Sequence, residues 1–144
     1  MLAREPSAAD ASSGAATGTA AAPREGTTEK SEADLQDIHF DFDKFSLTPE
    51  AREILKVHAE WLLDHGESMV TIEGHCDERG TQEYNLALGS RRAEEAKRFL
   101  VDLGVEEMRV KTVSYGEELP LDPGHNEQAW ARNRRVHFVV VQKM

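Results

Sequence analysis

The sequence MVTIEGHCDERGTQ, at residues 69–82, decides how the chain is organised. Apolar and polar side chains alternate over residues 69–74, which is typical of a strand with one buried face, and this pattern places Val70 and Ile72 in the core. Residues 75–82 follow as a polar loop at the carboxyl end of that strand. Open α/β sheets usually place their ligands at this edge. The sequence therefore predicts a binding site in this loop.

Before this strand, the sequence predicts another strand and a helix. Residues 38–43 alternate in the same way, which places Phe42 on the buried face with the other apolar residues of the strand. Thr48 and Pro49 are typical of a helix start, because a threonine hydroxyl caps free N–H groups and proline fits the first helical position. We expect Gly66 to end this helix in the left-handed conformation.

After the loop, the sequence predicts two helices. A short helix over residues 83–88 is expected to break at Gly89. Ser90 is expected to cap a second helix that runs to about Leu103, where Gly104 stops it. Apolar residues three or four positions apart give this second helix a face that packs on the sheet.

The rest of the sequence predicts two more strands, at residues 108–114 and 136–141. The second is almost continuously apolar, so we expect it to be buried on both faces. A short helical turn is expected around Trp130. The element order is then β-α-β-α-β-(short α)-β, and this alternation predicts an α/β fold in which helices pack on a mixed sheet.

Composition excludes several classes of protein. Lys and Arg number 17 and Asp and Glu number 27, which gives a net charge of −10. Such an acidic chain argues against non-specific binding to nucleic acid or anionic lipid. The single cysteine, Cys76, excludes an intramolecular disulfide and a zinc site of several cysteines. Because the sequence also lacks a phosphate-binding glycine loop, it predicts no cofactor.

The composition also divides the chain into two parts. Residues 1–36 are rich in Ala, Ser, Thr, Gly and Glu, and such a segment buries too little apolar area to offset its ordering entropy. We expect a disordered linker there and one compact domain at residues 37–144. A floppy terminus and a tether that lets the domain reach a distant target both fit this segment. We see no run of residues long and apolar enough to cross a bilayer and no intact secretory signal.

Two charged residues stand out as candidate ligand-binding groups. Asp77 lies in the polar loop and Arg92 begins the second helix, and the short helix between them lets the chain fold back so that both meet at one site. A carboxylate and a guanidinium held a ligand's width apart match a zwitterionic ligand. The protein carboxylate would bind the ligand ammonium, and the protein guanidinium would bind the ligand carboxylate. The alternative is that Asp77 caps a turn and Arg92 lies on a solvated helix face. Spacing alone leaves both open.

The sequence gives little support for catalysis. One hypothesis is that Asp41 and Asp43, with Asp77 nearby, form a carboxylate pair for acid–base chemistry. Nothing local indicates the pKa difference that this chemistry needs. No local motif supplies a base that would activate Cys76 as a nucleophile. His58 on the apolar helix face is typical of a core histidine. The sequence favours a protein that is not an enzyme.

Five ordered blocks carry a resemblance to a known family: FDFDK at 40–44, EGHCDERGT at 73–81, the group Glu83-Tyr84-Asn85, Leu88-Gly89 and Arg91-Arg92-Ala93, then VSYG at 113–116, and Asn133-Arg134-Arg135. Over about residues 37–141 the chain resembles the peptidoglycan-associated lipoproteins, a branch of the OmpA-like C-terminal domain family. The Asp-Glu-Arg-Gly-Thr run is similar to this branch rather than to the porin or flagellar-stator branches.

The resemblance implies non-covalent binding of peptidoglycan through the meso-diaminopimelate of its stem peptide. Asp77 matches the family's acid, expected on the ligand ammonium, and Arg92 matches the arginine expected on its carboxylate. Other residues match positions near the pocket, where some orient the two charged groups: Phe42, Asp43, Glu78, Arg79, Asn85 and Leu88. Cys76 departs from the family, which commonly has Thr or Ala there. Oxidation of that thiol would block the pocket.

The resemblance also implies partners and a location. Members carry a lipidated N-terminal cysteine, absent from this sequence, that anchors them in the outer membrane, and a polar linker like residues 1–36 follows it. The family belongs to the Tol–Pal system, which maintains the envelope and constricts the outer membrane during cell division. Its periplasmic β-propeller, TolB, binds a surface that overlaps the peptidoglycan pocket. The chain is then expected at the periplasmic face of the outer membrane. The alternative is a module whose main ligand is TolB.

Overall fold

The computed structural model of the chain describes residues 35–142, so the expected linker at 1–36 lies almost wholly outside the described residues. Four strands form one sheet in the order β1-β4-β2-β3. β4 is antiparallel to β1 and β2, and β2 is parallel to β3. The elements are β1 (Ile38–His39), α1 (Pro49–Asp64), β2 (Ser68–His75), α2 (Gln82–Asp102), η4 (Glu107–Arg109), β3 (Val110–Gly116), α3 (Glu127–Asn133) and β4 (Arg135–Gln142).

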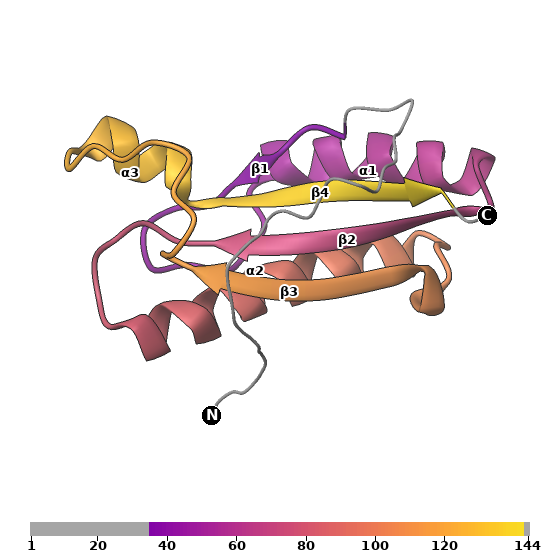
Figure 1. The fold of residues 1–144 in the computed structure, drawn as a ribbon. Coiled ribbons are helices and arrows are strands. Elements are labelled where there is room, and N and C mark those ends of the chain that lie inside the picture. Colours follow the sequence, from indigo (N-terminus) through magenta and orange to yellow (C-terminus); the bar gives the residue numbers. More distant parts are fainter. Residues whose placement is uncertain (1–34, 143–144) are drawn as a thin grey trace.

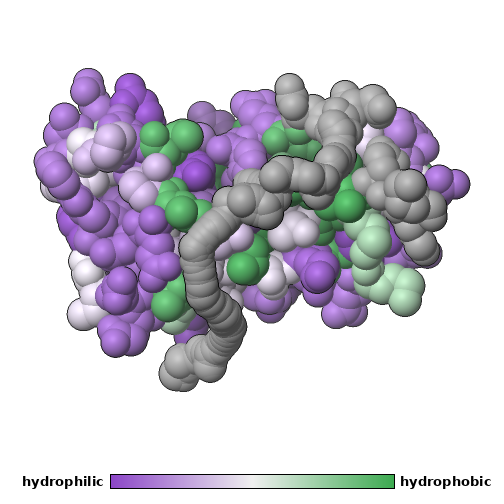
Figure 2. Space-filling view, in the orientation of Figure 1, coloured by the Kyte–Doolittle hydropathy of each residue, from purple (hydrophilic) through white to green (hydrophobic). Residues whose placement is uncertain are grey.

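The helices α1 and α2 cover the same face of the sheet, and α3 lies at the end where the β2–α2 loop emerges (Figure 1). This arrangement confirms the predicted α/β fold with a mixed sheet. No helix within residues 35–142 is long and apolar enough to cross a membrane. The described surface in Figure 2 is mostly hydrophilic, in keeping with a chain in which 31% of residues are charged.

The core lies between the sheet and these two helices. Val70 and Ile72 of β2 are buried there, as predicted, against α1 and α2. Each fully buried side chain of this size contributes roughly 1.5–3 kcal/mol. In β4, Val136 and Phe138 are buried but Val139 is only half-buried. The prediction that β4 is buried on both faces is therefore wrong, because both helices pack on one face and the strand alternates.

The N-terminal strand is shorter than predicted. β1 pairs with β4 over two residues only, Ile38 and His39. The chain then turns, with Lys44 N–H donating to the Asp41 carbonyl at 3.1 Å, and Phe42 is 51% exposed. The prediction of a strand over 38–43 with a buried Phe42 is therefore wrong. One further backbone bond, from Phe40 N–H to the Arg134 carbonyl at 3.0 Å, follows the last paired residues before the chain turns away.

Helix α1 begins as predicted and ends differently. The Thr48 hydroxyl accepts from Ala51 N–H at 3.0 Å and Pro49 is the first helical residue. Gly66 does not adopt the left-handed conformation. Arg109, far along the chain, donates instead to the Leu62 and His65 carbonyls, each at 2.8 Å. Because a buried side chain satisfies these carbonyls, a left-handed glycine is not needed.

Helix α2 runs unbroken through Gly89, so the predicted break there, with a cap at Ser90, is wrong. Gly89 serves close packing. A Cβ atom at Gly89 would lie 2.4 Å from the Ser114 hydroxyl, and one at Gly74 would lie 1.8 Å from the Gly89 carbonyl oxygen. At Gly89 the helix therefore contacts β2 backbone to backbone and meets the Ser114 side chain of β3. Gly104 does end the helix region in the left-handed conformation, as predicted.

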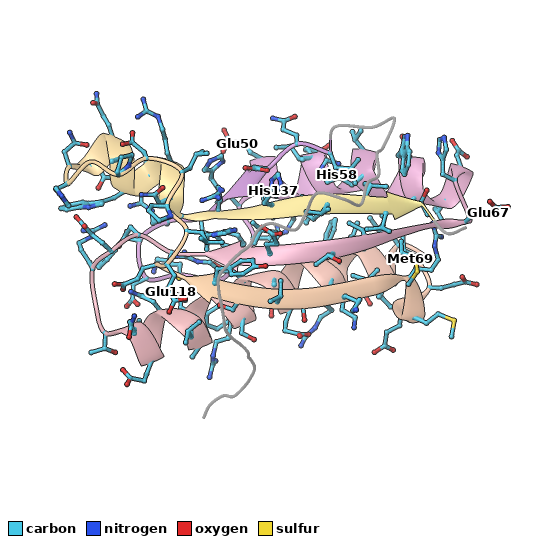
Figure 3. The ribbon with its side chains drawn as sticks, in the orientation of Figure 1. Glu50, His58, Glu67, Met69, Glu118 and His137 are labelled. Atoms are coloured by element: carbon cyan, nitrogen blue, oxygen red, sulfur yellow. The ribbon has the colours of Figure 1, made fainter. Side chains whose placement is uncertain are left out.

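His58 is the core histidine that the sequence predicts. It lies on α1 beside β4 (Figure 3) and is 2% exposed. Its Nε2 lies 2.8 Å from the Gln36 carbonyl oxygen, and its ring meets Phe138 edge-on with centroids 4.8 Å apart. Burial lowers the pKa of His58.

Candidate functional site

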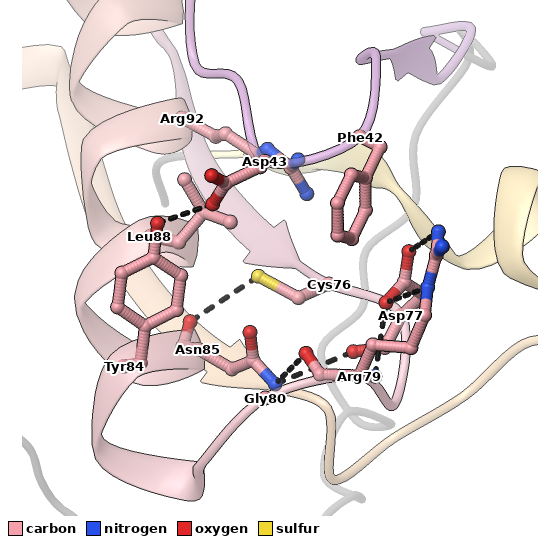
Figure 4. Close-up of a pocket in the computed structure, with 10 residues that line it drawn as sticks. All are labelled: Phe42, Asp43, Cys76, Asp77, Arg79, Gly80, Tyr84, Asn85, Leu88 and Arg92. Carbon is pink, nitrogen blue, oxygen red and sulfur yellow. Dashed lines mark hydrogen bonds and ion pairs between the residues drawn. The ribbon is translucent and has the colours of Figure 1, made fainter.

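A cavity of about 230 Å³ opens at the carboxyl end of β2 (Figure 4). Three segments line it: the turn after β1, the β2–α2 loop, and the first three turns of α2. The lining residues are Phe42, Asp43, Cys76, Asp77, Arg79, Gly80, Tyr84, Asn85, Leu88 and Arg92. The structure thus brings seven of the eight predicted site residues to one cavity, and Glu78 is the exception.

The acidic group of the cavity is Asp77, which is 4% exposed. Its Oδ1 accepts from Arg79 N–H at 3.0 Å, and its Oδ2 accepts from Arg79 Nη2 at 2.9 Å and Arg134 Nη1 at 3.3 Å. Burial would raise the pKa of Asp77, but the hydrogen bonds and charge of the arginines outweigh it and the pKa is lowered. Asp77 is therefore held as a carboxylate.

The basic group is Arg92, which is 1% exposed. Its guanidinium donates to three backbone carbonyl oxygens: Lys44 at 2.7 Å, His75 at 3.0 Å and Asp41 at 3.1 Å. These bonds tie the turn after β1 to the end of β2. A guanidinium has five N–H groups, so these contacts with described residues leave two for a ligand. Arg92 therefore does not lie on a solvated helix face, although Asp77 does cap a turn, as that alternative has it, by accepting from Arg79 N–H.

Arg79 lies between two aromatic rings beside the cavity. Its guanidinium carbon is 3.8 Å from the ring centre of Phe42 and 4.2 Å from that of Trp130. Such cation–π contacts contribute roughly 0.5–1 kcal/mol each at exposed sites. The Phe42 ring that the sequence places in the core is thus a wall of the site.

A second contact closes the opposite side of the mouth. The Tyr84 hydroxyl of α2 donates to the Asp43 carboxylate (Figure 4). Asp43 has a φ of 60°, the left-handed region that aspartate enters more readily than most residues. Sequence reasoning did not include Tyr84 among the site residues. Its position one turn before Leu88, on the helix that carries Arg92, was the available signal.

Asn85 and Cys76 form the floor of the cavity. The Asn85 amide donates to the Arg79 carbonyl at 3.1 Å and to Glu117 Oε1 at 2.6 Å, which fixes the loop on α2. The Cys76 thiol donates to the Asn85 carbonyl at 3.2 Å. Burial raises the pKa of Cys76 to about 12. The thiol therefore stays protonated and does not act as a nucleophile.

Glu78 points away from the cavity. Its carboxylate accepts from the indole N–H of Trp130 at 2.8 Å and lies 2.8 Å from His125 Nδ1. The Trp130 hydrogen bond, followed by that of His125, lowers the pKa of Glu78. Glu78 thus joins the β2–α2 loop to α3 and supports the site from outside.

The geometry does not arrange the carboxylates for acid–base chemistry. A general acid needs a raised pKa, whereas the pKa of Asp77 is lowered, and Asp43 is bonded to Tyr84. Among residues 35–142 there is no group of three or more His, Cys, Asp or Glu side chains that could hold a metal ion. The arrangement is suited to holding charges of both signs.

Arg134 lies closer to the site than the sequence indicates. Besides Asp77, its guanidinium donates to the Phe40 carbonyl at 2.9 Å and to Glu127 Oε2 at 3.0 Å. In the sequence, Arg134 stands out only as part of the Asn133-Arg134-Arg135 block, with no predicted place in the site. This contact between Arg134 and Asp77, 57 positions apart in the chain, has no local sequence signal.

The mixed sheet, the two packed helices and the charged cavity define an α/β domain with a candidate ligand-binding site. Residues 39–134 match the model of the OmpA family, and the chain belongs to this family. The predicted resemblance is thereby confirmed at the level of the family.

Relatives at high identity carry one name. The chain is 50% identical over 101 residues to the peptidoglycan-associated lipoprotein of Pseudomonas aeruginosa, covering 70% of this chain and 60% of that protein. It is 43% identical over 134 residues to the Pseudomonas putida protein of the same name, covering 93% and 80%. The chain thus spans less than two thirds of the P. aeruginosa relative.

Solved structures agree with the fold. The crystal structure of the peptidoglycan-associated lipoprotein from Burkholderia pseudomallei matches with a TM-score of 0.71 at 44% identity, over 72% of this chain and 88% of that one. The C-terminal domain of Helicobacter pylori MotB also matches with a TM-score of 0.71, at 16% identity, over 76% and 86%. The second match supports the fold alone.

Proposed function

We propose that the chain is a non-catalytic module that binds peptidoglycan by holding the diaminopimelate of a stem peptide between Asp77 and Arg92. The observation that carries the proposal is one cavity lined by both groups, with the first kept as a carboxylate and the second buried. The free end of diaminopimelate bears an ammonium and a carboxylate on one carbon. It therefore presents one charge to each group.

The size of the cavity favours a head group as its occupant. At about 230 Å³ it is smaller than the 300–1,000 Å³ typical of pockets for whole small molecules. One amino-acid end fits this description, and a glycan chain does not. Phe42 on one side and Tyr84 on the other then flank the ligand stem where it leaves the cavity.

The names of the relatives support a place in the cell envelope. Proteins 43–50% identical to this chain are called peptidoglycan-associated lipoproteins, and we propose an outer-membrane-associated role with the domain at the periplasmic face. Residues 1–36 would serve as the tether, and the lipidated cysteine would precede them. In this role the domain links the membrane to the wall and acts in the Tol–Pal system during cell division.

A second candidate function is docking of the propeller TolB on the same surface. Exposed apolar side chains around the cavity mouth support it. Phe42 and Tyr84, which line the cavity, are each 51% exposed. Aromatic residues of this kind are enriched at protein interfaces. Competition between a stem-peptide fragment and TolB supports a shared surface, and simultaneous saturation by both contradicts it.

Co-sedimentation with purified sacculi tests the main proposal. Asp77→Asn removes the negative charge but keeps the shape, and Asp102→Asn at the exposed end of α2 is the matched control. Losing one partner of a buried charge-assisted contact costs roughly 2–5 kcal/mol, about 30-fold or more in affinity. Asp77→Asn should stay in the supernatant while the control sediments. Equal sedimentation of both refutes the proposal. Release of soluble muropeptides by wild-type protein would refute its non-catalytic part.

A further inference from the structure

The carboxylate proposed to take the ligand ammonium already carries a cation of this chain. Arg79 makes three contacts with Asp77: its backbone N–H at 3.0 Å, Nη2 at 2.9 Å and Nε at 3.4 Å. Its guanidinium lies beside the cavity that the ligand would enter (Figure 4). Arg134 also donates to Oδ2 at 3.3 Å, so a ligand ammonium would be a third cation on this carboxylate, and like charges at this distance repel.

The two arginines on Asp77 differ in how firmly they are held. The Arg134 side chain is 9% exposed and also bonds the Phe40 carbonyl and the Glu127 carboxylate. The Arg79 side chain is 33% exposed, and within residues 35–142 its guanidinium hydrogen-bonds Asp77 alone. Arg134 is therefore a fixed partner, and Arg79 is an exchangeable one.

The surroundings offer Arg79 a second position. Its Nη2 lies 3.9 Å from Glu127 Oε1, beyond hydrogen-bond length but within reach of a small rotation. Phe42 and Trp130 stack on the guanidinium from two sides, and such stacking does not depend on the in-plane bonds to Asp77. Leaving Asp77 therefore costs Arg79 one carboxylate and brings it closer to another, the Oε1 side of Glu127, whose Oε2 accepts from Arg134 at 3.0 Å.

We propose that Arg79 is a built-in competitor that occupies the ammonium position of Asp77 and moves to Glu127 when the ligand binds. This inference rests on the proposed function and refines it. Displacement costs free energy, so a ligand that offers only an ammonium gains little. A ligand that also places a carboxylate on Arg92 recovers the cost. Arg79 thus lowers the apparent affinity of every ligand that places an ammonium on Asp77, and only a ligand that also engages Arg92 offsets that cost.

Isothermal titration of three synthetic stem tripeptides tests the role. They carry meso-diaminopimelate, lysine (ammonium only) or 2-aminopimelate (carboxylate only) at the third position. Arg79→Gln removes the competing charge, and Arg79→Lys keeps it. Because an occupied site lowers apparent affinity by the free fraction, Arg79→Gln should bind the first two peptides about 5-fold more tightly than wild type. Its affinity for the third peptide should not increase. Arg79→Lys should stay within about 2-fold of wild type.

A second readout follows the side chain itself. The Nε–H signal of Arg79 in ¹H–¹⁵N spectra should shift when the diaminopimelate peptide saturates the wild-type protein and should not shift with the 2-aminopimelate peptide. Three results would overturn the competitor role while leaving the proposed function intact. They are weaker peptide binding by Arg79→Gln, an equal gain in its affinity for all three peptides, and an Nε–H signal that does not shift. A wild-type protein that binds none of the peptides overturns both.

Discussion

Removing the Arg92 guanidinium should destabilise the domain as well as its ligand site. Arg92 donates to the carbonyls of Lys44, His75 and Asp41, and it is 1% exposed. Arg92→Ala leaves all three carbonyls without this donor and opens a gap between α2 and the turn after β1. Arg92→Lys keeps one charged donor.

The magnitude follows from the three bonds. A hydrogen bond to a charged group contributes about 1.5–3 kcal/mol, and removing a buried charge returns part of its desolvation cost. Water entering from the cavity also satisfies some of the freed carbonyls. The net loss is then about 3–5 kcal/mol, a large share of a total stability of roughly 5–15 kcal/mol. For a domain of this size the melting temperature should fall by roughly 15–25 °C.

Urea unfolding followed by circular dichroism at pH 7 measures this loss. The matched control is Arg91→Ala, since Arg91 is the neighbouring residue on the exposed side of α2. The control should change the free energy of unfolding by no more than about 0.5 kcal/mol. Arg92→Lys should fall between the control and Arg92→Ala. A loss below about 1 kcal/mol for Arg92→Ala would show that these bonds do not hold the turn and would refute the reasoning.

Three further predictions concern other parts of the site and fold. Gly74→Ala should destabilise the domain by several kcal/mol in urea unfolding, because its Cβ would lie 1.8 Å from the Gly89 carbonyl oxygen. A Gly66→Ala control, with no atom within 4 Å of the added Cβ, should have little effect. Equal losses of stability in the two variants would contradict the close-packing role of Gly74. Cys76, whose pKa is raised to about 12, should resist iodoacetamide at pH 8 in the native state and react in 8 M urea; rapid native labelling would contradict its burial. The lowered pKa of Asp77 means that its contribution to stability is present above its unfolded pKa of about 3.9 and is lost as pH falls through the folded value. Acid unfolding should therefore lose less free energy in Asp77→Asn than in wild type, and identical acid transitions would contradict this assignment.

Much of the fold could be predicted from the sequence because its signals are local. Val70 and Ile72 alternate with polar residues, and Thr48 with Pro49 marks a helix start, so both elements form as expected. The errors arise where a distant residue takes over a local role. Arg109 caps α1 in place of Gly66. Gly89 permits contact with β2 rather than breaking α2, and a glycine in a helical pattern gives no sign of which of these applies.

In the candidate site, too, the contacts with a local signal could be predicted and the others could not. Asp77 and Arg92 could be paired from their places in the loop and the helix, because the chain between them folds back. Arg134 and Trp130 come from the last quarter of the chain, and their contacts with Asp77 and Arg79 depend on the sheet order. Neither periodicity nor spacing carries that information. The ion pairs that Asp77 makes with Arg79 and Arg134 could not be predicted from the sequence either.

The most direct test of the central claim is a crystal structure of the domain with a stem peptide that contains meso-diaminopimelate. The account predicts the terminal ammonium within hydrogen-bond distance of the Asp77 carboxylate and the terminal carboxylate on the Arg92 guanidinium, inside the cavity. A peptide bound elsewhere, or one whose head group touches neither side chain, would contradict it.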